Sequence, residues 1–390
     1  MRALAAALLA LGVASGARAE PLPPPAEGSV RVAAFNASLS RAGAGVAWKD
    51  VAEGDAQPRA VAEIIRRVRP DVLLVLELDH DLEGRALGAL AALIAEDGAA
   101  PGVDYRHRLA APMNTGVPTG LDLDGDGAAA GPSDAQGWGR FPGQYGMALL
   151  SRLPIEGLRS FRRLLWAEMP GSLMPGAGMP EAAAMVQRLS SKSHWDVTLR
   201  LPGGETFHLL ASHPTPPVFD GPEDRNGRRN HDEIRFWIDY VSGEDWMTDD
   251  AGRRGGLAPG AAFVVAGDLN ADPADGEARR AAIAALLSHP RVQDPAPRSA
   301  GAASAAAAQG GANARHRGDP ALDTADWRDK PEPGNLRVDY VLPSTDWEVT
   351  AAGVFWPAPG APGAALVEGG RRPASSDHRL VWVDLRPDGR

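Results

Sequence analysis

The sequence predicts an α/β fold in which a sandwich of β-sheets is flanked by helices. Short apolar runs typical of buried strands alternate with segments whose apolar residues recur at the 3.6-residue period of a helix. Two of the strand-like runs are joined by a short Pro-Gly-Gly turn, as in a β-hairpin. No linker or internal repeat divides the chain, so we expect residues 20–390 to form a single domain.

The first hundred residues predict two strands and two helices. A strand is expected at 31–36 and another at 72–76, where the apolar run ends at Glu77. The helix between them, at 58–69, begins with a proline and stops just before another. Residues 86–95 form a second, largely apolar helix.

The rest of the chain continues this alternation. Residues 195–201 and 206–211 predict the two strands of the hairpin, and residues 230–241 predict a helix with one apolar face. Further short strands are expected at 147–150, 261–266, 337–342 and 380–385.

Three segments have the composition of loops. Residues 112–144 are rich in Gly, Asp and Pro and predict a long loop, and residues 170–183 predict a shorter one. Residues 297–318 are rich in Ala, Gly and Ser, which indicates a mobile insertion.

Composition excludes several classes of function. The chain has no cysteine, so disulfides, cysteine nucleophiles and thiolate metal sites are ruled out. The formal charge of −10 argues against a protein that grips nucleic acid through a broad basic surface. It leaves a phosphate substrate open, because a bound cation can supply positive charge locally.

The N-terminus has the pattern of a secretory signal peptide. A positive start is followed by an apolar run over residues 3–13 and by the small-residue cleavage motif at 17–19. The alternative is a short buried helix, but several prolines follow at once and would break it. We therefore expect residues 1–19 to be removed and the mature protein to be secreted or periplasmic, without stable insertion in a membrane.

Polar residues capable of chemistry occur at the ends of six predicted strands. A carboxylate beside an apolar strand is costly to bury unless opposite charge or hydrogen bonds offset the cost. Oxygen donors suit hard cations such as Mg²⁺ or Mn²⁺, and histidines can act as proton acceptors or donors. A single polar residue at the end of a strand more often forms a turn or caps a helix than takes part in chemistry. The ordered set is Asn36, Glu77, His213, Asp268 with Asn270, Asp339, and Asp377 with His378.

This ordered set resembles the endonuclease/exonuclease/phosphatase family, which includes DNase I-like nucleases. The similarity runs from about residue 31 to residue 385, and its most specific elements are Gly267-Asp268-Leu269-Asn270 and Ser376-Asp377-His378. The resemblance implies a four-layer α/β sandwich with two central mixed β-sheets and helices outside. It also implies a divalent-metal-dependent phosphoesterase as the activity of the domain.

The resemblance assigns roles residue by residue. Glu77 matches the principal metal ligand, with Asn36 beside it and Asp377 as a metal or supporting group. Asp268 and Asn270 match the residues that orient the nucleophile and contact the phosphate. His378 and His213 match histidines on either side of the phosphate. Asp339 matches a second acidic metal ligand or a partner of the histidine, and Tyr145 lies near the position of the family's site tyrosine.

The segment 213–227 is specific to this chain. Four prolines stiffen it, and its charged residues cluster at its C-terminal end. One interpretation is a rigid loop over the site, with Arg225 or Arg228 reaching a phosphate. The alternative is a solvated surface loop, and the sequence favours neither. Lys192 and His194 precede the hairpin and are expected to flank its first strand rather than to touch substrate.

Residues 122–127 begin like a calcium loop, with acids at alternate positions. The twelfth position is Ser133 rather than Glu, which rejects an EF-hand. A structural Ca²⁺ stays open here, but a turn-forming Asp/Gly cluster is the favoured interpretation.

Two hypotheses from different classes follow. The first is a secreted, Mg²⁺- or Mn²⁺-dependent enzyme that hydrolyses phosphodiesters or phosphomonoesters by in-line attack of water, with short nucleic acid as one candidate substrate. The second is a non-catalytic binding module that retains the fold. The complete polar set favours the enzyme. No protein partner is predicted, and the physiological substrate is not specified by the sequence.

Overall fold

The computed structural model describes residues 21–330, 332–369 and 373–388. The signal peptide expected at residues 1–19 lies outside this part. Within the described residues, eleven strands form two sheets. The first sheet has the order β10-β11-β1-β2-β4-β3, with bounds Trp347–Val354, Val381–Pro387, Val30–Leu39, Val72–Leu78, Met147–Ser151 and His107–Leu109. The second has the order β5-β6-β7-β8-β9, with bounds Ile155–Ser160, His194–Arg200, Thr206–Ser212, Phe263–Asp268 and Asp339–Pro343.

Both sheets are mixed, as the resemblance implied. In the first, β1 pairs in parallel with β2, and in the second β7 pairs in parallel with β8; the other pairs are antiparallel. The ends of parallel neighbours meet at one edge of a sheet. The side chains that follow β1, β2, β7 and β8 are therefore brought to a common edge of the sandwich.

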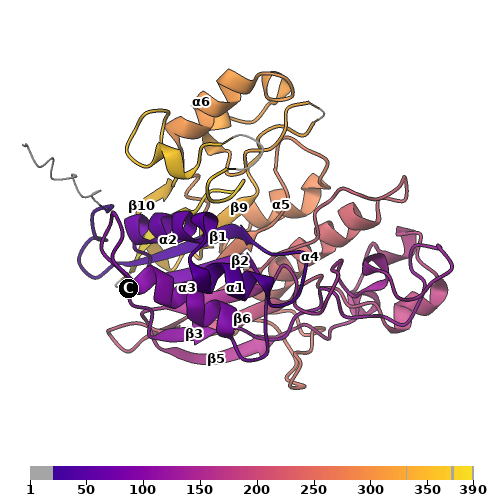
Figure 1. Cartoon of the computed structure of the whole chain (residues 1–390). Coiled ribbons are helices and arrows are strands. Elements are labelled where there is room, and N and C mark those ends of the chain that lie inside the picture. The colour runs from indigo at the N-terminus through magenta and orange to yellow at the C-terminus, as the bar shows by residue number, and fades with distance from the viewer. Residues whose placement is uncertain (1–20, 331, 370–372, 389–390) are drawn as a thin grey trace, which may run out of the picture.

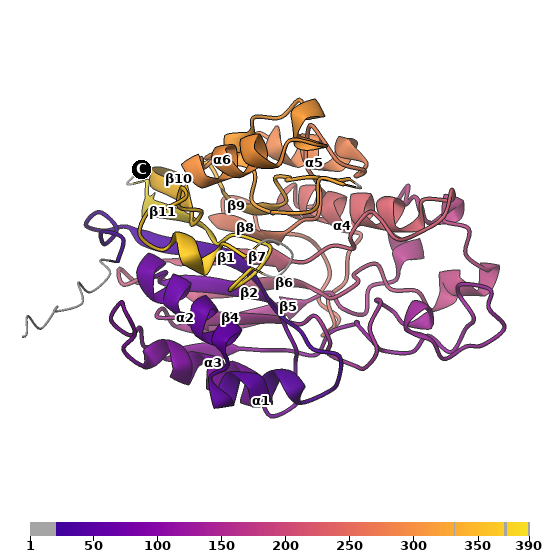
Figure 2. The same ribbon diagram turned by 45° about the horizontal axis from the view of Figure 1, so that its top comes forward.

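The described part of the chain has six α-helices beside the sheets: α1 Val46–Glu53, α2 Ala56–Val68, α3 Arg85–Ala95, α4 Arg225–Val241, α5 Arg280–Leu287 and α6 Ala300–Gln309. Figure 2 shows α1, α2 and α3 covering one outer face, and α4 and α5 on the opposite side of the strands. Helix, sheet, sheet and helix thus form four layers (Figure 1). None of the helices in residues 21–330, 332–369 and 373–388 combines the length and apolar character needed to cross a membrane.

Three apolar clusters hold the layers together. Alternate residues of a strand point to opposite faces of its sheet. Phe35 and Val75 accordingly pack toward α2 and α3, whereas Ala34 and Leu74 pack toward the second sheet. The third cluster lies between the second sheet and α4 and α5, where Trp237 is fully buried. Each sheet is buried on both faces, which explains its continuous apolar strands.

Every strand and helix expected from the sequence is present, with shifted ends. The helices and strands that were not anticipated are α1, α5, α6, β3, β5 and β10. These are short or lie at sheet edges. In β5 and β10 nearly all residues are half-buried or exposed, so the apolar signal of a strand is weak.

Two expectations about loops are corrected by the structure. Residues 297–318 were expected to be a mobile insertion, but they contain α6, whose Ala302 is fully buried in the first core cluster. A run of small residues lacks an apolar period, so its packing could not be read from spacing. The helix expected at 230–241 begins five residues earlier, at Arg225, which shortens the loop that precedes it.

Ser299 caps α6, and this contact gives a first prediction. Its hydroxyl accepts hydrogen bonds from the backbone amides of Gly301 and Ala302 at 3.1 and 3.2 Å. Loss of such a cap costs about 1 kcal/mol. We expect Ser299→Ala to lower the free energy of unfolding by about this amount in urea titrations. Ser304→Ala, on the same helix, is the matched control, and an equal effect of both variants would contradict the capping role.

Candidate active site

The carboxylate of Asp268, at the end of β8, lies at the centre of the polar set. Its Oδ2 accepts a hydrogen bond from the Asn36 amide at 3.1 Å, and its Oδ1 accepts one from the backbone amide of Asn270 at 2.9 Å. The Nε2 atoms of His213 and His378 lie 3.4 and 3.7 Å from Oδ2. Burial alone would raise the pKa of Asp268, but His378, His213 and Asn36 outweigh it and hold this pKa well below its usual range. The carboxylate is therefore ionised.

His378 is held as a cation by two carboxylates. Its Nδ1 lies 2.9 Å from Asp339 Oδ2 at the start of β9, and its Nε2 faces Asp268. Burial would lower the pKa of His378, but Asp339 and Asp268 raise it well above its ordinary value. Burial also raises the pKa of Asp339 to about 6. Asp339 is thus the orienting partner of a protonated histidine.

His213 has the opposite character. Burial, with a smaller contribution from the positive charge of Lys192, lowers the pKa of His213 to about 4. Its Nδ1 is buried and has no hydrogen-bond partner within the described residues. The imidazole is therefore neutral at pH 7 and can accept a proton or a hydrogen bond. The site holds a neutral and a charged histidine on either side of one carboxylate.

Three of the candidate site residues have left-handed backbone conformations, among them Tyr145 with a φ of 55°. Glu77 has a φ of 58° within β2, and Asn270 has a φ of 51° just after β8. Non-glycine residues rarely adopt this region, and such strain is concentrated at functional sites. The pairing of β1 with β2 also shifts register after Asn36. These irregularities re-aim the side chains at the strand ends.

Glu77, Asn36 and Asp377 form the oxygen-rich part of the site. Burial raises the pKa of Glu77 to about 7; the negative charge of Asp377 adds to the rise, while His378, Asn36 and Lys192 oppose it. Asp377 Oδ2 accepts a hydrogen bond from Trp327 Nε1 at 3.2 Å. A carboxyl group with a raised pKa beside other acids is the environment that a divalent cation would stabilise.

The oxygen atoms of Glu77, Asn36 and Asp377 fit a divalent cation, and a second group of potential ligand atoms lies nearby. The ligand atoms of Asp268, Asp339 and His378 lie within 4.8 Å of one another. Asp339 Oδ1 is buried and has no hydrogen-bond partner in the described part of the chain. Both ring nitrogens of His378 already face carboxylates, so oxygen atoms are the better donors. Carboxylate and amide oxygens suit Mg²⁺ or Mn²⁺.

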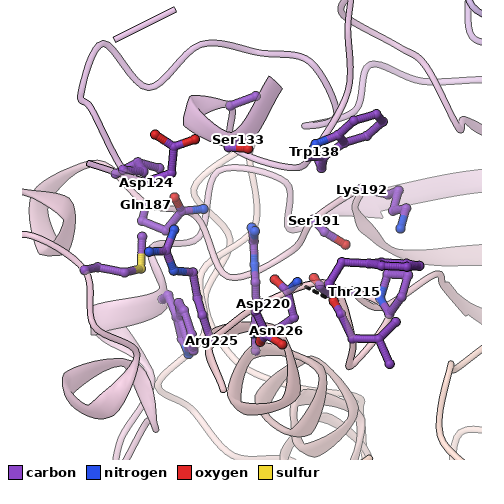
Figure 3. Close-up of a pocket in the computed structure, with 18 of the residues that line it drawn as sticks. Asp124, Ser133, Trp138, Gln187, Ser191, Lys192, Thr215, Asp220, Arg225 and Asn226 are labelled. Carbon is purple, nitrogen blue, oxygen red and sulfur yellow. Dashed lines mark hydrogen bonds between the residues drawn. The ribbon is translucent and has the colours of Figure 1, made fainter. Parts of the chain in front are cut away.

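A cavity of about 720 Å³ opens beside this cluster. Glu77, Tyr145 and His213 line it at the end near the strands, and Arg225 lines it from the first turn of α4. Its walls come from the loop 112–144, the segment before β6 and the segment 213–229. In Figure 3, Lys192 and Thr215 lie on the right of the cavity, and Asp124 and Gln187 lie on the left.

The two arginines expected near substrate have different positions. Arg225 lines the cavity, and its Nε donates to the Ala177 carbonyl at 3.4 Å. Arg228 does not line the cavity; its Nε donates to the Glu223 carbonyl at 2.9 Å, and its guanidinium lies against Gly176.

Lys192 is in the cavity, contrary to its interpretation as a residue that merely flanks a strand. It precedes β6 and is buried. A lone lysine before an apolar strand gave only a weak signal. Its position depends on the packing of this segment against the loop 112–144, where the Asn114 amide donates to the Lys192 carbonyl at 3.0 Å.

The acids of residues 122–126 do approach one another, with ligand atoms within 4.8 Å. Their oxygens, however, accept backbone amides: Asp122 accepts from Gly125 and Gly127 at 2.7 and 2.9 Å. These contacts are those of a turn-forming Asp/Gly cluster. A structural Ca²⁺ at this loop stays a prediction.

The segment that supports Asp339 gives a prediction on pH. Burial raises the pKa of Asp323 to about 8, and the neighbouring Asp272, Asp275 and Asp319 add to the rise. The folded state thus holds a proton that the unfolded state releases near pH 4, so stability is lost as pH rises from about 4 to about 8. We expect Asp323→Asn to remove this loss, so that its thermal unfolding midpoint rises relative to that of the unmodified protein between pH 5 and pH 8. A constant difference across that window would contradict the assignment.

Comparisons with known proteins agree with this architecture. Residues 46–378, most of the chain, match the endonuclease/exonuclease/phosphatase family. No curated protein matches the sequence. Among solved structures, an endonuclease/exonuclease/phosphatase from Beutenbergia cavernae has 20% identity and a TM-score of 0.51, covering 93% of this chain and 72% of its own.

Two further solved structures are more distant. The human Nocturnin catalytic domain has 15% identity and a TM-score of 0.46, with 94% of this chain and 96% of that chain covered. Sphingomyelinase C from Streptomyces griseocarneus has 16% identity and a TM-score of 0.44, with 91% and 99% covered. The similarity to the Beutenbergia cavernae structure supports the fold alone, and membership of the family rests on the match over residues 46–378. The chain belongs to the endonuclease/exonuclease/phosphatase family.

Proposed function

We propose that this protein is an exported, divalent-metal-dependent phosphoesterase that hydrolyses phosphodiesters or phosphomonoesters by in-line attack of water. One observation carries the proposal. The Oδ2 of Asp268 lies 3.4 Å from the Nε2 of His213 and 3.7 Å from the Nε2 of His378, and the surroundings lower the pKa of His213 and raise the pKa of His378. Hydrolysis of a phosphoester needs a proton acceptor for water and a donor for the charge that develops on oxygen. Both are present within one buried cluster.

The residues divide this work by charge. Asp268 is ionised and orients the attacking water, and neutral His213 is the adjacent group able to accept a proton. His378 is held protonated by Asp339, so it donates to a phosphate oxygen. The Asn270 side chain donates to the Pro214 carbonyl at 3.1 Å and so holds the loop that carries His213. A cation bound by Glu77, Asp377 and Asn36 would polarise the phosphate and stabilise the leaving oxygen.

The substrate class is narrowed by charge. A chain of net charge −10 lacks the broad basic surface that duplex DNA requires, so small phosphoesters are favoured and short nucleic acid is the second candidate. Export is proposed from the pattern of residues 1–19. The mass of the protein recovered from the periplasm or the medium tests this export. Cleavage after residue 19 predicts the mass of a chain that begins at Glu20.

The central prediction concerns Asp268. Asp268→Asn keeps the shape of the side chain but removes the charge that orients water and holds His378 protonated. We expect kcat on bis-p-nitrophenyl phosphate, p-nitrophenyl phosphate or plasmid DNA to fall by about 10² to 10⁴. Asp104→Asn, an exposed aspartate outside the site, is the matched control and should retain activity. Full activity of folded Asp268→Asn on the preferred substrate would refute the mechanism.

The metal gives a separate prediction. EDTA should abolish turnover, and Mg²⁺ or Mn²⁺ should restore it. Because Glu77 is the proposed principal metal ligand, Glu77→Gln should raise the Mn²⁺ concentration for half-maximal activity by about tenfold or more. Calorimetric titration with Mn²⁺ measures the same loss without substrate. Turnover that survives EDTA and dialysis would exclude a metal-dependent reaction.

A further inference from the structure

Lys192 is a buried cation without a partner. Lysine occurs only at positions 49, 192 and 330 of this sequence, so arginine supplies nearly all other positive charge. The Lys192 residue is 6% exposed and lines the cavity together with Glu77 and His213. Within the described residues its ammonium group has no ion pair or side-chain hydrogen bond. A buried, unpaired charge is costly, so such a position is retained only where something offsets it.

The acids around Lys192 are already engaged with other donors. Glu233, on α4, accepts the backbone amides of Ser191 and Thr215 at 2.6 Å each. The Asp268 carboxylate accepts hydrogen bonds from the side-chain amide of Asn36 and the backbone amide of Asn270. Both contribute favourable charge at longer range, as does Glu77, yet burial still lowers the pKa of Lys192 below its ordinary value. The ammonium therefore faces the cavity with its donors free for an anion.

The cavity beyond Lys192 has the size and lining of a small-molecule site. Pockets for compact organic ligands measure several hundred cubic ångströms and combine apolar walls with a few polar groups. This cavity of about 720 Å³ is lined by aromatic Trp138, Tyr145 and Phe219, and the rings of Trp138 and Tyr145 have centroids 6.0 Å apart. Figure 3 shows Trp138 above Lys192 on the same side of the cavity.

We propose that Lys192 binds a non-bridging oxygen of the substrate's phosphate and that the cavity holds the organic group of a small, aromatic phosphoester of about nucleotide size. This inference rests on the proposed function and names its substrate class. The ammonium group of Lys192 lies between the acidic residues around Asp268 and the aromatic wall formed by Trp138 and Tyr145. The phosphate would therefore bind where these two parts of the cavity meet. The organic group then stacks on Trp138, and a long polymer is not required to fill the volume.

The first test measures anion binding without catalysis. Inorganic phosphate and phenyl phosphate are titrated into the EDTA-treated protein, and the rise in the thermal unfolding midpoint gives each affinity. We expect Lys192→Met to weaken both by about tenfold or more, and Lys192→Arg to restore most of the loss. Lys49→Met, whose lysine is exposed on α1, should bind like the unmodified protein. Equal affinities of the unmodified protein and folded Lys192→Met would overturn the proposal.

The second test separates the phosphate from the organic group. Trp138→Ala should weaken phenyl phosphate by about threefold or more while leaving inorganic phosphate unchanged. In kinetics with the preferred small phosphoester, Lys192→Met should lower kcat/KM by about tenfold or more, and Trp138→Ala should act chiefly through KM. If plasmid DNA is hydrolysed far better than every small phosphoester, the substrate class is wrong.

The two proposals fail in different ways. If the unmodified protein hydrolyses nothing with any metal, the proposed function fails, whereas loss of phosphate binding in Lys192→Met would still establish the anion site. If the unmodified protein is active but Lys192→Met has the same kcat/KM and phosphate affinity, the phosphoesterase stands and the role of Lys192 is refuted.

Discussion

The ionised carboxylate of Asp268 is the contact on which the site depends. It ends β8 in the second sheet and accepts a hydrogen bond from Asn36 in the first, so it joins the two central layers. Its negative charge holds His378 protonated, while neutral His213 lies on its other side. Burial would neutralise a lone carboxylate, so the donors from four separate segments are what allow this charge to persist.

The four-layer architecture explains why these segments meet. Two sheets buried on both faces must stack through a shared apolar core, which leaves their polar groups at the strand ends. The parallel pairs β1–β2 and β7–β8 bring Asn36, Glu77, His213 and Asp268 to one edge. Antiparallel β9 begins at that edge with Asp339. The left-handed conformation of Glu77 then turns its carboxylate within an otherwise apolar strand.

A cavity formed by two long segments of this chain lies next to the polar strand ends. The loop 112–144 and the segment 213–229 close around the strand ends. Glu233, on α4, accepts hydrogen bonds from the backbone amides of Ser191, before β6, and of Thr215, in the segment 213–229. Figure 1 shows these long connections extending to one side of the sheets. The proposal of a small phosphoester rather than a polymer rests on the buried Lys192, the aromatic walls of this cavity and the negative net charge.

The sequence by itself determined the class of the layers and the polar set at the strand ends. Strand and helix periods are local properties, and the motifs around Asp268 and His378 are contiguous, so both could be read without coordinates. Only the tertiary structure decided which side chains share a cavity. Lys192 lines this cavity and Arg228 does not, and a segment of small residues forms α6. These positions depend on contacts between segments far apart in the chain, which local periodicity does not encode. The opposite charge states of the two histidines were likewise set by burial and by neighbouring carboxylates, which spacing does not encode.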